Sequence, residues 1–183
     1  MESKKDIRRH ILEHRACMSQ KDWEEKSRII AKKVVSHPFF LCANTVYCYV
    51  DYRQEVGTRS IIEHAWKMGK KVAVPKIMDN HMEFYYVSDY TELEEGYRGI
   101  SEPVLCIEPA SDERPLIIMP GVAFDKSRSR IGYGKGYYDT YLQNHTGCDT
   151  LAICFEMQMV EQIPSQTHDY KPDIIITEEN IYA

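Results

Sequence analysis

The chain has 183 residues, a mass of 21.4 kDa and a formal net charge of −5 at pH 7. This length suits one domain with a buried core, and we expect residues 1–183 to form a single domain that acts as a monomer. The pI near 5.8 argues against a nucleic-acid-binding surface, and no apolar run approaches the roughly 20 residues needed to cross a bilayer, so neither nucleic acid nor membrane is an expected partner.

The N-terminal segment MESKKDIRRHILEHR is charged and lacks the apolar stretch of a secretory signal, which favours a cytoplasmic protein. The cysteines form no CxxC pair and no metal-ligand spacing. We therefore expect buried thiols in a reducing compartment rather than disulfides or a metal centre. These residues are Cys17, Cys42, Cys48, Cys106, Cys148 and Cys154.

Residues 3–18 are predicted to form a helix with an apolar side and a basic side. The apolar side consists of Ile7, Ile11, Leu12 and Ala16. Lys4 and Arg8 are i, i+4 neighbours on one face, which is typical of a solvated basic surface when the helix stands alone.

A second helix is predicted from its cap and its apolar stripe. Ser19 is placed to cap it, and it should end before His37-Pro38. Its inner stripe consists of Trp23, Ser27, Ile30 and Val34.

The first strand is predicted over Thr45–Asp51, which is rich in β-branched and aromatic residues. Glu55 follows in a loop just beyond the C-terminal end of this strand. Ligands of open α/β sheets bind at such ends, although an acid in a loop is also common at a plain surface.

The next segments alternate between helix and strand. Thr58 should cap a helix that runs to Met68 and stops at Gly69, and the strand over Lys70–Pro75 then gives a parallel pair with a right-handed crossover. Alternation in Met82–Ser88 predicts an antiparallel neighbour. Further strands are expected over Leu116–Pro120, over Thr150–Phe155 and in IIIT after Asp173. Gly99 to Pro103 is predicted as a turn before an extended segment, which leaves Glu102 without an assigned role.

A glycine-rich loop follows the strand over Leu116–Pro120 and precedes a helical pattern that begins at Tyr137. Gly132, Gly134 and Gly136 stand at alternate positions, with Lys135 between the last two. Strand, glycine loop and helix is an arrangement in which backbone N–H groups converge on an anion. The segment from Gly121 to Gly136 contains four basic residues and one acidic residue. Its local charge of +3 favours an anionic ligand such as phosphate.

The spacing GxGxG is neither the Walker loop, which needs Ser or Thr after GK, nor the dinucleotide motif GxGxxG. Lys135 would bring a mobile positive charge to phosphate oxygens, and Asp139, one turn into the helix, could hold a metal ion that bridges them. The alternative is a glycine-rich turn followed by a helix whose Asp139 complements the helix dipole.

The segments PGVAFD and RIGYGKGYYDTYL closely resemble the 5-formyltetrahydrofolate cyclo-ligase family, also called methenyltetrahydrofolate synthetase, and the likeness extends along nearly the whole chain. It includes the element G-I-x-E-P at Gly99–Pro103 and departs at Arg128, where the family usually has Gly. The resemblance implies a three-layer, Rossmann-like α/β fold: an open, mostly parallel sheet with helices on both faces, of the sugar-phosphate isomerase and CoA-transferase type.

The resemblance also implies residue roles. The expected catalytic residues are Lys135 and Arg130. The expected folate contacts are Val50, Glu55, Tyr133 and Tyr137. The expected magnesium ligands are Asp139 and Asp173. The expected ATP-binding residues are Lys4, Arg8, Arg130, Ile131, Gly132, Tyr133, Gly134, Lys135, Gly136, Tyr137 and Tyr138. Tyr137 and Tyr138 are adjacent, so we expect one to face inward and one outward.

The implied activity is the ATP-dependent closure of 5-formyltetrahydrofolate to 5,10-methenyltetrahydrofolate, with ATP and Mg²⁺ as cofactors and release of ADP and phosphate. The γ-phosphoryl group would activate the formyl oxygen, so that folate nitrogen 10 could attack the carbon and displace phosphate. Two other interpretations of the glycine loop remain: a sugar-phosphate isomerase that needs no ATP, and a non-catalytic module that binds nucleotide or folate.

Overall fold

The fold is built around a seven-stranded sheet with the strand order β12-β11-β9-β6-β1-β2-β3. The computed structural model describes residues 2–79, 81–96, 99–164 and 169–183. The strands of this sheet are β1 (Thr45–Cys48), β2 (Lys71–Met78), β3 (His81–Val87), β6 (Leu116–Met119), β9 (Asp149–Ile153), β11 (Ile174–Ile176) and β12 (Ile181–Tyr182). Neighbouring strands from β11 to β2 are parallel, whereas β12 and β3 add antiparallel edges. The mostly parallel sheet is thus confirmed, as is the antiparallel position of β3.

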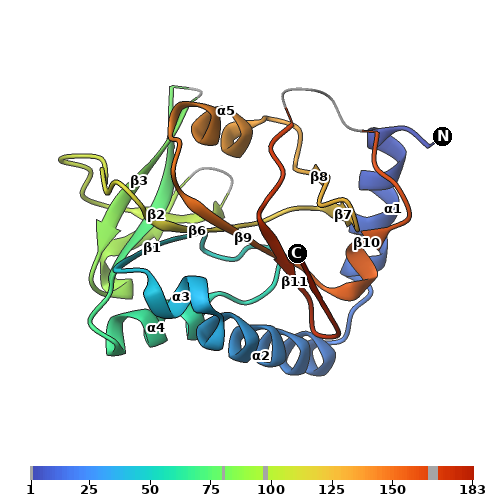
Figure 1. The fold of residues 1–183 in the computed structure, drawn as a ribbon, viewed down its shortest axis with the longest axis horizontal. Coiled ribbons are helices and arrows are strands. Elements are labelled where there is room, and N and C mark those ends of the chain that lie inside the picture. Colours follow the sequence, from blue (N-terminus) through green and yellow to red (C-terminus); the bar gives the residue numbers. More distant parts are fainter. Residues whose placement is uncertain (1, 80, 97–98, 165–168) are drawn as a thin grey trace.

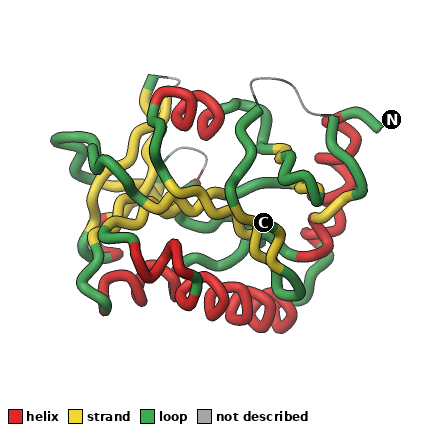
Figure 2. Tube along the Cα trace, viewed as in Figure 1, coloured by secondary structure: helices red, strands yellow, loops and turns green. Residues whose placement is uncertain are grey.

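Helices cover both faces of the sheet, which gives three layers (Figure 1). On one face lie α2 (Gln20–Ser36), α3 (Pro38–Cys42) and α4 (Arg59–Lys67), and on the other lies α5 (Tyr137–Asn144). Figure 2 shows the same separation of the helices by the strands. Because successive side chains of a strand point to opposite faces, Ile118 packs in the core beneath α2 and Ile117 packs in the core beneath α5.

A smaller sheet forms one flank of the molecule, where α1 (Lys4–Ala16) packs beside it (Figure 1). Its strand order is β10-β7-β8, with β7 (Ala123–Asp125), β8 (Arg130–Ile131) and β10 (Met159–Val160). Ile7 and Ile11 of α1 share an apolar cluster with Val122 and Ile131. The remaining elements are the hairpin of β4 (Leu93–Glu95) and β5 (Ser101–Pro103) and the short helices η1 (Tyr90–Glu92) and η3 (Glu156–Gln158).

Several helix ends and faces differ from the sequence-based expectation. Ser3 caps α1 instead of belonging to it, and Arg15 is buried on this helix whereas Ala16 is exposed. Ser19 caps α2 as predicted. Thr58 stands at the start of α4, but its hydroxyl donates to Asp51 (2.9 Å) and forms no cap.

The segment between β6 and the glycine loop is a β-hairpin, not the single loop that the sequence predicts. Its turn places Arg128 in the left-handed region, with φ of 63°, while the Arg128 N–H donates to the Asp125 carbonyl (2.9 Å). Glycine adopts this conformation at low energy, which explains why glycine suits the position. Arg128 keeps the turn and donates a hydrogen bond to the Asp173 carbonyl (2.5 Å).

The expectation of six buried thiols is wrong. Cys48 and Cys154 are buried, Cys106 and Cys148 are intermediate, and Cys17 and Cys42 are exposed; all six are free. Burial raises the pKa of the Cys48 and Cys154 thiols, which keeps them protonated and unreactive.

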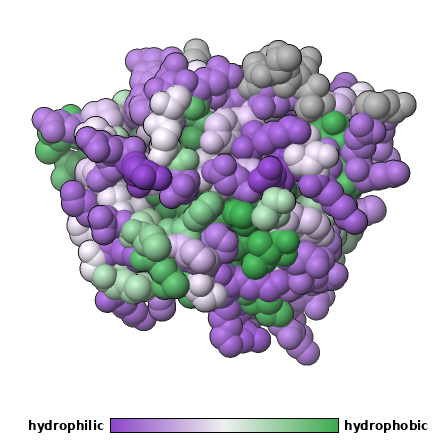
Figure 3. All heavy atoms as spheres, in the orientation of Figure 1, coloured by the Kyte–Doolittle hydropathy of each residue, from purple (hydrophilic) through white to green (hydrophobic). Residues whose placement is uncertain are grey.

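The face shown in Figure 3 is predominantly hydrophilic, with hydrophobic residues gathered near its centre over β11 and β12. Ile181 of the edge strand β12 is half exposed. Within the described part of the chain, none of the helices combines the length and the apolar character that crossing a membrane requires.

The order of the strands fixes where a ligand can bind. The chain leaves β1 through α4 on one face to reach β2, but it leaves β6 through α5 on the other face to reach β9. β1 and β6 are neighbours, so their following segments diverge at their carboxyl ends and leave a crevice between them.

Candidate active site

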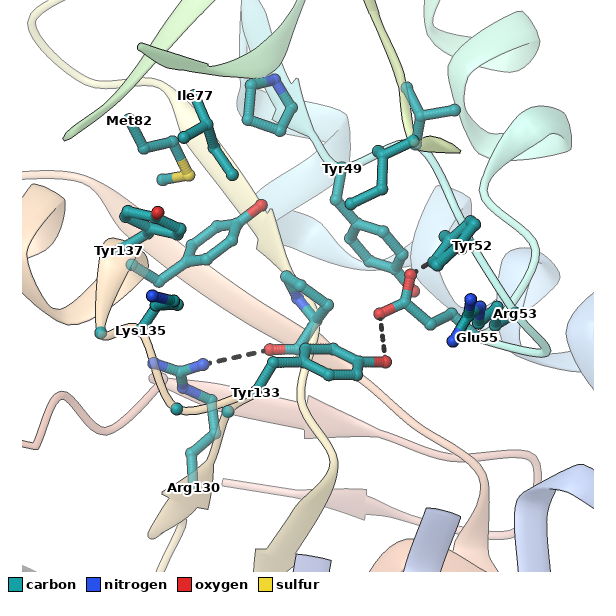
Figure 4. Close-up of a pocket in the computed structure, with 18 of the residues that line it drawn as sticks. Tyr49, Tyr52, Arg53, Glu55, Ile77, Met82, Arg130, Tyr133, Lys135 and Tyr137 are labelled. Atoms are coloured by element: carbon teal, nitrogen blue, oxygen red, sulfur yellow. Dashed lines mark hydrogen bonds between the residues drawn. The ribbon is translucent and has the colours of Figure 1, made fainter. Parts of the chain in front are cut away.

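A cavity of about 680 Å³ opens at the carboxyl ends of β1, β6 and β2. Tyr49 follows β1, Pro120 follows β6 and Pro75 belongs to β2, and all three line it. In Figure 4, Lys135 and Tyr137 lie on one side of the cavity and Tyr49, Tyr52 and Glu55 lie on the other, with Tyr133 between them. The size is that of a site for small molecules, and its position is the switch point of the sheet.

The glycine loop forms one wall of this cavity. Gly134 and Gly136 have φ values of 101° and 68°, a region that side chains rarely adopt, so these two glycines allow the tight path of the loop. Gly136 is also the N-cap of α5 and provides no side-chain acceptor for the first amides of that helix. Arg8 of α1 donates from Nε to the Gly132 carbonyl (2.9 Å) and ties the loop to the first helix. Lys135 is exposed and is therefore available to an anion.

Arg130 is buried beside the glycine loop and forms an ion pair with Asp139, with Nη2 2.8 Å from Oδ1. Its Nη1 donates to the Pro120 carbonyl (3.3 Å), whereas its Nε has no hydrogen-bond partner among the described residues. The buried hydroxyl of Tyr138 is likewise unpartnered within this part of the chain. Both residues line the cavity, and unpaired buried polar atoms in a cavity wall are typical of groups that a ligand completes.

A hydrogen-bonded chain links three segments that are far apart in sequence. Arg15 of α1 donates from Nη2 to Tyr133 Oη (2.8 Å), and Tyr133 Oη donates to Glu55 Oε1 (2.7 Å), as Figure 4 shows for the second bond. The other oxygen of Glu55 accepts from the Tyr52 N–H (2.9 Å). Because the Arg15 N–H occupies an acceptor site of the hydroxyl, the hydroxyl proton is directed at Glu55.

The environment of Glu55 shifts its pKa upward. Burial is the main cause, while the Tyr133 hydrogen bond and the positive charge of Arg15 act in the opposite direction. Glu55 is only 7% exposed, so this carboxyl group is not the surface acid that its loop position alone suggested. Burial also raises the pKa of Tyr133 well above its usual range, which keeps the phenol protonated as a donor.

The structure brings most of the predicted site residues to this one cavity. They are Val50, Glu55, Arg130, Gly132, Tyr133, Gly134, Lys135, Gly136, Tyr137, Tyr138 and Asp139. Tyr137 and Tyr138 are both half-buried and both line the cavity, so the expectation that one faces outward is wrong.

Four predicted residues lie outside the cavity lining. Arg8 contacts the glycine loop from behind, Lys4 pairs with Asp169 (2.5 Å), and Ile131 is buried in β8. Asp173 stands before β11, where its Oδ2 accepts from both the N–H and the hydroxyl of Thr150 (2.9 and 2.6 Å). This pairing anchors the start of β11 to β9.

Sequence reasoning missed several cavity residues, among them Arg15, Tyr52, Arg53 and Glu102. Arg15 lies seven residues, or two helical turns, beyond Arg8, so its spacing placed it on the basic face of α1. Tyr52 and Arg53 lie three and two residues before Glu55, and the backbone of Arg53 is left-handed, with φ of 45°. Nothing in the sequence around them distinguished these two from ordinary loop residues.

Asp139 is the cavity residue that could hold a metal ion. No group of three or more His, Cys, Asp or Glu side chains suited to a metal occurs in the described ranges. The Asp139 Oδ1 already accepts from Arg130 and from the Tyr170 N–H (3.0 Å). Such a sparse donor set fits magnesium that arrives with phosphate ligands, because magnesium keeps water and phosphate and takes only one or two carboxylates.

Comparison with known proteins identifies the relatives of the chain. A model of the 5-formyltetrahydrofolate cyclo-ligase family matches residues 1–178. The chain belongs to this family. It is 36% identical over 176 residues to a probable 5-formyltetrahydrofolate cyclo-ligase of Schizosaccharomyces pombe, covering 86% of each chain. It is 27% identical to the cyclo-ligase of Escherichia coli K12, covering 94% of this chain and 98% of the relative.

Solved structures of cyclo-ligase relatives share the fold. The 5,10-methenyltetrahydrofolate synthetase of Aquifex aeolicus superposes with a TM-score of 0.86 at 30% identity, covering 97% of this chain and 91% of the other. The synthetase of Mycoplasma pneumoniae gives a TM-score of 0.76 at 22% identity, and the match covers 97% of this chain and 99% of the other. The predicted three-layer α/β fold of this family is therefore confirmed.

Proposed function

We propose that this cyclo-ligase family member closes 5-formyltetrahydrofolate to 5,10-methenyltetrahydrofolate with consumption of ATP, and that the cavity at the switch point is its active site. The observation that carries the proposal is the meeting of two kinds of recognition in one cavity. Lys135, Arg130 and the glycine loop offer positive charge to phosphates, while the buried Glu55 offers a carboxylate to the N–H groups of a pterin.

The phosphate side holds and neutralises the triphosphate. Lys135 contacts phosphate oxygens as a mobile charge, and the Arg130 guanidinium is fixed by Asp139 and the Pro120 carbonyl so that its direction does not change during the reaction. Arg8 holds the loop through the Gly132 carbonyl. Lys4 and Arg8 place two cations on the N-terminal helix, and the charge of Lys4 is paired with Asp169.

Asp139 is the cavity carboxylate that would hold a magnesium ion brought by the triphosphate, with Asp173 as the second carboxylate. When bound, the ion neutralises charge on the phosphates. Arg130 pairs with Oδ1 of Asp139, so Oδ2 of the same carboxylate is the oxygen left for the ion.

The folate side orients the substrate. Glu55 accepts hydrogen bonds from the pterin, and Val50, Tyr133 and Tyr137 provide apolar and aromatic surface, because flat rings stack well on rings. The formyl oxygen attacks the γ-phosphorus, and ADP leaves. Nitrogen 10 then attacks the formyl carbon, the carbon–oxygen bond breaks, phosphate departs, and the nitrogen loses its proton. The protein contributes position and electrostatics rather than a covalent intermediate.

The test is incubation of the purified chain with 5-formyltetrahydrofolate and MgATP, with the methenyl product followed by its absorbance. We expect product only when nucleotide is present, with ADP and phosphate formed in equal amounts to it. Product formation at the same rate without nucleotide contradicts the proposal.

A further inference from the structure

A second buried carboxylate lines the cavity and has no assigned role. Glu102 of β5 is 5% exposed, close to the value of Glu55. Glu55 has partners on both oxygens, whereas the carboxylate of Glu102 forms no hydrogen bond or ion pair with any residue that the structure describes. Lys76, on the adjacent strand β2, donates instead to the Pro103 carbonyl (2.8 Å). The Glu102 oxygens are not among the fully buried unpartnered atoms of the described residues, so they are open to the cavity, where a ligand can provide a partner.

The surrounding backbone keeps this carboxylate in place at a cost to stability. The register of the β4–β5 hairpin sets Glu94 directly opposite Glu102, and like charges in that position repel each other. Gly96 leaves the space that the carboxylate fills, because a Cβ at position 96 would lie only 2.7 Å from Glu102 Cδ. Neither feature gives Glu102 a partner, and the cavity that it lines is where one can approach.

The chemistry of the cavity limits what that ligand group can be. A carboxylate repels phosphate, which excludes the triphosphate as the partner of Glu102. Glu102 and its neighbour Ile100 reach the cavity from the hairpin that packs on β2, and β2 provides the apolar residues Pro75 and Ile77. An acceptor within an apolar wall fits a flat heterocycle that carries N–H donors.

We propose that Glu102 is a second substrate-binding carboxylate, which accepts a hydrogen bond from an N–H group of the reduced folate. This inference rests on the proposed function and extends it by one contact residue. Glu55 after β1 and Glu102 on β5 then both accept hydrogen bonds from the same folate. A site with two carboxylates selects a ligand rich in N–H donors over one that lacks them.

The experiment measures the dissociation constant of 5-formyltetrahydrofolate without nucleotide, by calorimetry, for the wild type and Glu102→Gln. The substitution keeps the shape but removes the charge, and we expect affinity to fall on the order of tenfold or more, as for loss of a hydrogen bond to a charged group. The affinity for a non-hydrolysable ATP analogue should stay within about twofold, because a carboxylate is not a partner for phosphate. The matched control is Glu95→Gln, an exposed acid of the same hairpin outside the cavity lining, which should bind folate as the wild type does.

A second variant makes the test independent of the folding of the first. Gly96→Ala retains Glu102 but displaces its carboxylate, and we expect a parallel loss of folate affinity with the thermal unfolding transition still cooperative. Wild-type affinity in either folded variant overturns the inference and leaves the proposed function intact. Failure of the wild type itself to bind 5-formyltetrahydrofolate is a different result, which overturns the proposed function.

Discussion

Tyr133 and Glu55, which are 78 positions apart in the chain, are joined by a hydrogen bond of 2.7 Å across the cavity. The tyrosine belongs to the glycine loop and the glutamate to the segment after β1. This bond therefore couples the proposed phosphate side of the site to the proposed folate side. It also helps to keep Glu55 ionised although the carboxyl group is buried.

Removal of the Tyr133 hydroxyl should change the pH dependence of folate use. The raised pKa of Glu55 is opposed by the Tyr133 hydrogen bond and by Arg15, so Tyr133→Phe should raise this pKa further. Since the ionised carboxylate is the proposed acceptor for folate, kcat/KM for folate should fall as the pH drops through that pKa. We expect the acid limb of the pH profile to move to higher pH and kcat/KM at neutral pH to fall roughly tenfold.

The control for this substitution is Tyr90→Phe, which removes another tyrosine hydroxyl outside the cavity lining. The pH profile of kcat/KM for this variant should match that of the wild type. An unchanged acid limb in Tyr133→Phe would show that the hydroxyl does not govern the ionisation of Glu55.

Lys135 is the exposed cation of the glycine loop, and Lys135→Ala should lower turnover by on the order of a hundredfold or more, as for loss of other preorganised charges. The measurement is the ATP-dependent formation of methenyl product. Lys126→Ala, at an exposed lysine in the β7–β8 turn, is the control and should leave the rate unchanged. Near-normal turnover in Lys135→Ala would refute the role of this residue.

Arg130 and Asp139 should show a large coupling free energy in protein stability, because the arginine is buried and its Nη2 lies 2.8 Å from Asp139 Oδ1. Arg130→Met leaves the aspartate without its main partner, and we expect the free energy of unfolding to fall by about 3 kcal/mol. Urea unfolding of both single variants and of Arg130→Met with Asp139→Asn measures the coupling. Additive effects within about 0.5 kcal/mol would mean that the two side chains act independently.

The proposed magnesium site predicts different effects for its two carboxylates. Asp139→Asn should raise the magnesium concentration needed for half-maximal turnover, because Asp139 lies in the cavity. Asp173→Asn should also lower thermal stability, since the Asp173 carboxylate accepts two hydrogen bonds from Thr150. Magnesium titrations of turnover, compared with unfolding curves, separate the two effects. An unaltered magnesium requirement in Asp139→Asn would exclude this residue as a ligand.

Arg128 occupies a left-handed position that glycine would adopt with less strain. Arg128→Gly removes about 2 kcal/mol of backbone strain, loses one exposed hydrogen bond to Asp173 worth about 1 kcal/mol and adds about 0.5 kcal/mol of unfolded-state entropy, so we expect a net gain of roughly 0.5 kcal/mol. Ser127→Gly, one residue earlier where φ is not positive, should instead destabilise by roughly 0.5 kcal/mol through unfolded-state entropy. Urea unfolding measures the change in the free energy of unfolding for each variant. Changes of the same sign in the two variants would contradict the strain argument.

Local sequence patterns were sufficient to predict the main strands, the layered fold and the glycine loop. Periodicity in the chain reports which residues meet the core, and this is why β6, β9 and α2 lie close to their predicted ranges. The same reasoning placed Ala16 rather than Arg15 on the inner face of α1, because charge normally indicates exposure.

Only the tertiary structure decided which polar groups meet. Arg15, Tyr133, Glu55 and Glu102 come from four separate segments, and nothing local to any of them specifies the others. Their burial follows from strand order, which places the ends of β1, β6 and β2 around one crevice, and burial in turn sets charge and hydrogen bonding. The sequence by itself therefore determined the framework and the glycine loop, whereas long-range packing determined the hydrogen-bond partners, and with them the proposed folate side of the site.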